Sequence, residues 1–124
     1  MIASNWIPVI LRIAFFGCIV LLAALSLLPA MVMTRTSVGG PLEHVVAYQG
    51  TAIVMGLAYP KSPRLVVQSA LLIAVAAALE AGQLYAPGRR ASFQDFAAGA
   101  AGVVTGALFL WYARSRILNW LKLD

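Results

Sequence analysis

The sequence predicts an all-α fold, an integral membrane bundle of four transmembrane helices with a short C-terminal interfacial helix. The 124 residues are 62% hydrophobic and only 10% charged, whereas a water-soluble domain carries about 25% charged residues. The mean hydropathy is +0.90. Four windows are long and apolar enough to cross a bilayer, which takes about 20 residues. We therefore expect residues 1–124 to form a single transmembrane domain.

The first two windows cover residues 7–28 and 43–59. Pro29 ends the first window, which is long for the apolar region of a cleaved signal peptide, so we expect it to remain as a span. The second window is short. It begins just after Pro41, a residue type favoured at the start of a helix, and Pro60 ends it.

The third and fourth windows cover residues 65–85 and 93–112. The turn-forming pair Pro87-Gly88 closes the third window. Basic residues alternate with apolar and aromatic ones along residues 114–124, a composition that suits a short helix lying in the membrane interface. We interpret this tail as a lipid anchor, and a partner-binding helix is the alternative.

The distribution of basic residues predicts the orientation. Four spans place both termini and the middle loop on one side, which carries Arg12, Lys61, Arg64, Arg114, Arg116 and Lys122. The opposite side carries Arg35, Arg89 and Arg90. Because Lys and Arg are retained in the cytoplasm, we predict a multi-pass protein of the cytoplasmic (inner) cell membrane with both termini in the cytoplasm. The net charge of +5 then points to membrane lipids as partners, and to no nucleic acid.

Small residues recur at every fourth position in the last two windows. In the third window they are Ala70, Ala74, Ala78 and Gly82, and in the fourth Ala98, Gly102 and Gly106. Transmembrane helices associate through close backbone approach, because lipid offers no hydrophobic driving force between them. These two stripes predict that the third and fourth helices dock against each other.

Polar residues gather at the predicted outer ends of the last three spans. The candidate binding residues are His44, Glu80, Gln83, Arg89 and Asp95. Glu80 follows an unbroken apolar run over residues 69–79, where an unpaired carboxylate is costly, so it must pair with an arginine or stay protonated. We therefore predict one outward-facing charged cluster.

Each member of this cluster also has a purely structural interpretation. Ser92 and Asp95 resemble a capping box, and an acid in the first helical turn is favoured by the helix dipole. Arg89 can contact lipid phosphates, and His44 can be an interfacial polar residue. No ligand spacing of a metal site and no phosphate-binding or dinucleotide motif occurs, so we predict no metal and no cofactor. The catalytic residues, if any, are unknown, although Glu80 or Asp95 could act as a general base.

One stretch of this cluster resembles a known family. The residues from Glu80 to Asp95, EAGQLYAPGRRASFQD, are similar to the signature of VanZ-like membrane proteins, in which Glu, Gln, Arg and Asp recur at these offsets. Residues 25–29 and the pair His44 and Tyr48 are also similar to that family. The resemblance covers about residues 21–108.

Three positions depart from the family pattern. The family commonly has an Asp-Lys pair a few residues before the histidine, where this chain has Gly40 and Pro41. It often has Asn four residues after the aspartate, where Gly99 stands. The polar side chains of the family pattern are therefore missing at these three positions.

The resemblance implies a membrane protein of the bacterial envelope that contributes to resistance to glycopeptide antibiotics of the teicoplanin type. It implies no particular reaction. We interpret the outer cluster as a non-enzymatic binding site for an envelope lipid or amphiphile, such as a lipid-linked envelope precursor or the glycopeptide. Two alternatives stay open, a membrane-embedded enzyme acting on a lipid-linked substrate and a structural subunit of a membrane complex.

Overall fold

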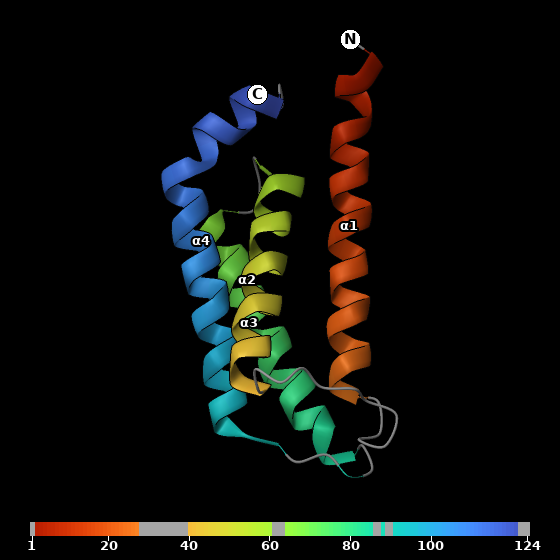
Figure 1. Ribbon diagram of the computed structural model, residues 1–124, viewed down its shortest axis with the longest axis vertical. Helices are drawn as coiled ribbons and strands as arrows, with labels where there is room; N and C mark the ends of the chain where they lie inside the picture. The colour runs from red at the N-terminus through yellow and green to blue at the C-terminus, as the bar shows by residue number, and fades with distance from the viewer. Residues whose placement is uncertain (1, 28–39, 61–63, 86–87, 89–90, 122–124) are drawn as a thin grey trace.

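The computed structural model describes residues 2–27, 40–60, 64–85, 88 and 91–121, and within these ranges the chain is helical with no β-strand (Figure 1). The helices are α1 (Ile2–Leu27), α2 (Gly40–Ala58), α3 (Leu65–Gly82), the 3-10 helix η2 (Gln83–Tyr85) and α4 (Phe93–Leu121). The predicted all-α class is confirmed. Helices α3 and α4 begin at the predicted residues, because the apolar windows start directly after polar loops.

Three segments of the described chain are long and apolar enough to cross a membrane: Trp6–Leu27, Leu65–Tyr85 and Phe93–Leu121. The helices run alongside one another in alternating directions, and α1 begins at the same end of the bundle at which α4 stops (Figure 1). We call this the terminal end. Helix α2 has 19 residues but is not among these segments, and its apolar residues are interrupted by Glu43, His44 and Gln49.

Helix α2 lies at the centre of the bundle. It contacts each of the other three α-helices, and its contact with α4 is the most extensive in the molecule. Its buried residues are Tyr48, Thr51, Ala52, Met55, Gly56 and Ala58. Because neighbouring helices cover so much of its surface, α2 does not need the continuous apolar surface that a lipid-exposed helix requires.

Three buried glycines of α4, Gly99, Gly102 and Gly106, form its contact with α2, and we call them the glycine seam. A Cβ atom added at Gly102 would overlap the backbone carbonyl oxygen of Val45. A Cβ at Gly106 would lie 2.8 Å from the carbonyl oxygen of Gln49. The backbones of α2 and α4 therefore approach so closely that no side chain fits between them, as in other membrane helix pairs rich in small residues.

The predicted docking of α3 on α4 through their small-residue stripes is wrong. Gly102 and Gly106 face α2, and the α3 residues Ala70, Ala74 and Ala78 are exposed. The buried face of α3 consists instead of Gln68, Leu72, Ala76 and Glu80. The spacing of small residues shows which faces can approach a neighbour closely, but it does not specify which neighbour, and α2 occupies the glycine face of α4.

Helix α1 packs on the others along a narrow stripe. Phe15 and Leu22 are buried, whereas Ile13 and Val20 are each 67% exposed, as lipid-facing residues would be. Near the terminal end, the Arg12 guanidinium lies 5.3 Å from the centroid of the Tyr59 ring. The Phe15 ring meets the same tyrosine edge to face at 5.9 Å. An aromatic contact therefore joins α1 to the residue that follows α2.

The predicted separate interfacial helix is not present as such, because α4 continues without a break to Leu121. No glycine or proline follows Gly106, so nothing in the sequence interrupts the helix. Its final turns lean away from the axis of the earlier ones (Figure 1). They expose Trp111, Tyr112 and Trp120, the residue types that favour the membrane–water interface.

Candidate functional site

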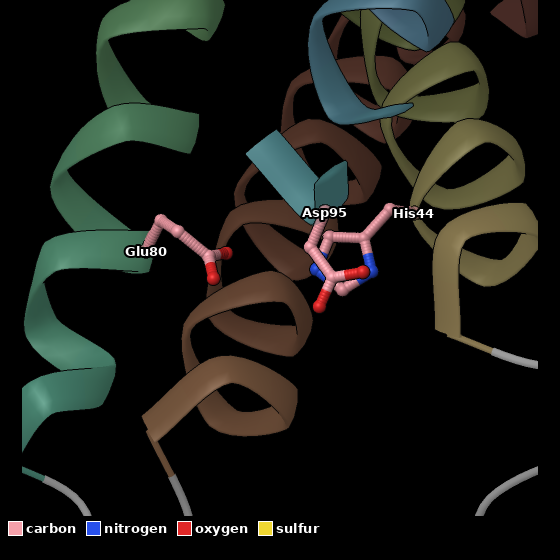
Figure 2. A group of neighbouring side chains, drawn as sticks. All are labelled: His44, Glu80 and Asp95. Carbon is pink, nitrogen blue, oxygen red and sulfur yellow. The ribbon is translucent and has the colours of Figure 1, made fainter. Parts of the chain in front are cut away.

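The antiparallel order of the helices brings three titratable side chains together at the end opposite the terminal end. His44 lies in the second turn of α2, Glu80 in the last turns of α3 and Asp95 in the first turn of α4. One nitrogen or oxygen atom from each lies within 4.8 Å of the other two. Figure 2 shows the three side chains extending toward one another from separate helices. We call them the His–Glu–Asp cluster, and this end of the bundle the cluster end.

The orientation of His44 depends on an aromatic neighbour. Its imidazole stacks on the Tyr48 ring one helical turn later, with centroids 6.2 Å apart and planes 19° from parallel. Tyr48 is buried, and its ring lies against Gly99 of α4, where a Cβ atom would come within 3.1 Å of the ring. Gly99 thus makes room for the tyrosine on which the histidine stacks.

Glu80 is the most buried member of the cluster, with 8% of its surface exposed. The backbone N–H of Ser92 donates a hydrogen bond of 2.5 Å to its Oε1 atom. A short bond from a backbone donor to a carboxylate belongs to the stronger class of hydrogen bonds. This bond fixes one carboxylate oxygen and joins the end of α3 to the residue that precedes α4.

Asp95 shows half of the predicted capping box. Its backbone N–H donates to the Ser92 hydroxyl at 3.3 Å, so Ser92 caps α4. In a complete box the acid would accept the Ser92 N–H in return, but Glu80 accepts that N–H instead. The Asp95 carboxylate therefore extends into the cluster, as Figure 2 shows.

Among the described residues, neither the predicted Gln83 nor the acid Glu43, which was not a candidate binding residue, is one of these three. Gln83 is buried in η2 at the same end of the bundle. Glu43 precedes His44 in the first turn of α2 and is half-buried. Arg89, which was expected to contact a phosphate or carboxylate group, lies outside the described residues.

A shallow pocket of about 300 Å³ opens beside the cluster, between the end of α3 and the start of α4. Glu80 and Ser92 supply its polar lining, and the other lining residues are Ala77, Ala91, Phe93 and Phe96. The two phenylalanine rings lie 6.1 Å apart in a tilted arrangement. One side of the pocket is therefore apolar and aromatic, and the other offers a carboxylate.

Two features of the site were not predicted. The sequence interpretation gave no role to Tyr48 beyond the family resemblance, although its spacing of four residues from His44 places both on one helix face. It also missed the hydrogen bond of 3.1 Å that the Gln49 amide donates to the Thr105 hydroxyl across the α2–α4 contact. No local pattern indicates such a pair, because the two residues come together only in the folded bundle.

Fold and site together define a helical membrane protein with a cluster of one histidine and two carboxylates at one end of its bundle. No family model, curated protein or solved structure matches the chain.

Proposed function

We propose that the chain is a VanZ-like integral membrane protein of the bacterial cell envelope that binds an amphiphilic envelope lipid at its cluster end. The observation that carries this proposal is the pocket that Phe93 and Phe96 line together with Glu80 and Ser92. Ligand sites typically combine an apolar lining with a few placed polar groups. A lipid would lay its apolar part over the aromatic side and direct its head group to the carboxylate side.

The proposal includes α2 as a fourth span. Its 19 residues rise about 28 Å at 1.5 Å per residue, close to the hydrocarbon thickness of about 30 Å. The polar Gln49 bonds to Thr105 of α4, and the exposed Val46 is apolar. A helix that directs its polar groups to neighbouring helices can cross a bilayer at lower mean hydropathy than one that lipid surrounds.

The charges of the described residues support an outward-facing cluster end. Every arginine in the described ranges lies near the terminal end: Arg12, Arg64, Arg114 and Arg116. Every acid in those ranges lies at the cluster end: Glu43, Glu80 and Asp95. Because basic residues favour the cytoplasmic side, this separation supports cytoplasmic termini and a cluster that faces away from the cytoplasm.

Lipid retention tests the binding site directly. Ala77→Phe would fill the pocket, whereas Ala78→Phe places the same ring on an exposed position of α3 outside the pocket lining. We expect the first variant to lose co-purifying lipid about tenfold, equivalent to about 1.4 kcal/mol, as measured by mass spectrometry of the purified protein. The second should retain it at the wild-type level. If both variants retained the same amount of lipid, the result would contradict lipid binding in this pocket.

The resemblance of residues 80–95 to the VanZ-like signature supports a contribution to teicoplanin-type resistance. Expression of the wild-type chain in a susceptible bacterium should then raise the inhibitory concentration of teicoplanin. Glu80→Gln should abolish this effect at equal protein abundance, and Glu43→Gln, a matched acid outside the cluster, should keep it. A wild-type chain that inserts but leaves susceptibility unchanged would contradict the resistance role.

A further inference from the structure

We propose that His44, Glu80 and Asp95 hold a divalent transition-metal ion, Zn²⁺ by chemical preference, and leave one coordination position open to a ligand. The three residues offer one imidazole nitrogen and two carboxylate groups from three different helices, all within 4.8 Å of one another. Nitrogen and oxygen donors of this kind bind Zn²⁺, and three protein ligands with an open fourth position are typical of its reactive sites. The inference goes beyond lipid binding, because it stands whether or not a lipid occupies the pocket.

The spacing of the ligand atoms is compatible with an ion after a small adjustment. An ion bound tetrahedrally at about 2.0 to 2.2 Å holds its ligand atoms about 3.4 Å apart. The widest separation in the cluster, 4.8 Å, must therefore shorten by about 1.4 Å. Rotation of the Glu80 and Asp95 side chains about their single bonds can supply such a shift without moving the helices.

Neighbouring groups already orient the ligands, as outer-shell groups do in metal sites. The Ser92 N–H holds Oε1 of Glu80 at 2.5 Å. Tyr48 supports the His44 ring by stacking, and the Ser92 cap fixes the first turn of α4 that carries Asp95. These contacts come from the protein alone, so the site is arranged before an ion arrives.

Electrostatics also favours a cation at this place. Two negatively charged carboxylates that lie close together, one of them buried, repel each other, which is a free-energy penalty. A divalent ion between them reverses this penalty, because it becomes the largest local charge. It would also give the adjoining pocket a positive centre beside Glu80, which an anionic head group could contact through the open position.

The test uses the full chain, purified in detergent with an affinity tag that contains no histidine, stripped with a chelator and titrated with Zn²⁺ alone. We expect calorimetry to show one ion per chain. His44→Ala, Glu80→Gln and Asp95→Asn should each weaken binding about tenfold or more. Glu43→Gln removes an acid next to His44 that is outside the cluster, and it should leave the affinity unchanged.

A second measurement does not depend on the variants folding. X-ray absorption of the Zn²⁺-loaded wild-type protein should show one imidazole among oxygen neighbours at about 2.0 to 2.2 Å. Absence of Zn²⁺ binding by a wild-type chain that melts as a folded bundle would overturn the proposal. So would an unchanged affinity in all three folded variants, or sulfur from Cys18 in the coordination shell. Ala77→Phe should keep Zn²⁺ affinity while losing lipid, which separates failure of the metal site from failure of the lipid site.

Discussion

The two ends of the bundle are built differently. At the cluster end, α2 and α4 are in backbone contact at Gly102, and Glu80 is buried and hydrogen-bonded to Ser92. Toward the terminal end, α3 and α4 border an open apolar groove of about 370 Å³ that reaches Trp111. Tyr112 there is 80% exposed.

This difference indicates that the two ends of the bundle have different structural requirements. A group of polar side chains from three helices needs backbones fixed to within fractions of an ångström, and the glycine seam together with the Ser92 bonds provides this at one end. The other end needs only to place Arg and Trp side chains in the membrane interface, where long or amphipathic side chains adapt their positions.

The largest effect should follow from breaking the glycine seam. Gly102→Ala would direct a Cβ atom at the Val45 carbonyl oxygen, a backbone atom that cannot rotate away. We expect a loss of about 2–3 kcal/mol in the free energy of unfolding, measured by denaturation in mixed micelles. Gly50→Ala is the control, because nothing lies within 4 Å of its added Cβ. It should be neutral or stabilising by up to about 1 kcal/mol, and equal losses in both variants would contradict the close approach of α2 and α4.

A smaller effect should follow at the terminal end. Tyr59→Leu removes the ring that Arg12 and Phe15 contact, and we expect a loss of about 1 kcal/mol in the same denaturation measurement. Zn²⁺ affinity should stay at the wild-type value, because the contact is remote from the cluster end. Tyr112→Leu, at an exposed position, should change stability by less than about 0.5 kcal/mol. A Tyr59→Leu variant with weakened Zn²⁺ binding would show that the two ends are coupled.

The smallest effect concerns the hydrogen bond that joins α2 to α4. Thr105→Val removes the acceptor of the Gln49 amide, and interhelical bonds in membranes contribute about 0.6 kcal/mol on average. Thr51→Val is the matched control, because the Thr51 hydroxyl donates to the Ala47 carbonyl of its own helix. Denaturation should show a loss of about 0.6 kcal/mol only for Thr105→Val. A greater loss for Thr51→Val would contradict the importance of the interhelical bond.

Much of the fold could be predicted from the sequence, because the signals are local. Apolar runs bounded by polar and turn-forming residues predicted the helices, and their alternating directions placed His44, Glu80 and Asp95 at one end. Ser92 signalled the start of α4, and the structure shows its cap. Glu80 was singled out because it follows a long apolar run, and the structure shows it buried with a hydrogen bond from the Ser92 N–H.

The pairing of helix faces could not be predicted, because it depends on competition among several possible neighbours. Both α3 and α4 offer small residues at spacing four, but α2 takes the glycine face of α4. The role of Gly99 became apparent only with Tyr48 beside it. Ligands drawn from three separate helices leave no spacing pattern, so the sequence predicted no metal site where three potential ligands meet.

Our central claim is that α2, which is not among the three segments long and apolar enough to cross a membrane, does cross it and carries the cluster to the face opposite the termini. Cys18 is the only cysteine in the chain, so Cys18→Ser provides a background for single labels. Leu42→Cys then marks an exposed position in the first turn of α2, and Arg64→Cys marks an exposed position after α2, directly before α3. On intact cells, we expect a membrane-impermeant maleimide to label the Leu42→Cys variant and not the Arg64→Cys variant. After permeabilisation, the Arg64→Cys variant should be labelled as well. Labelling of both positions from outside would contradict the crossing of α2, and labelling of Arg64→Cys alone would reverse the orientation.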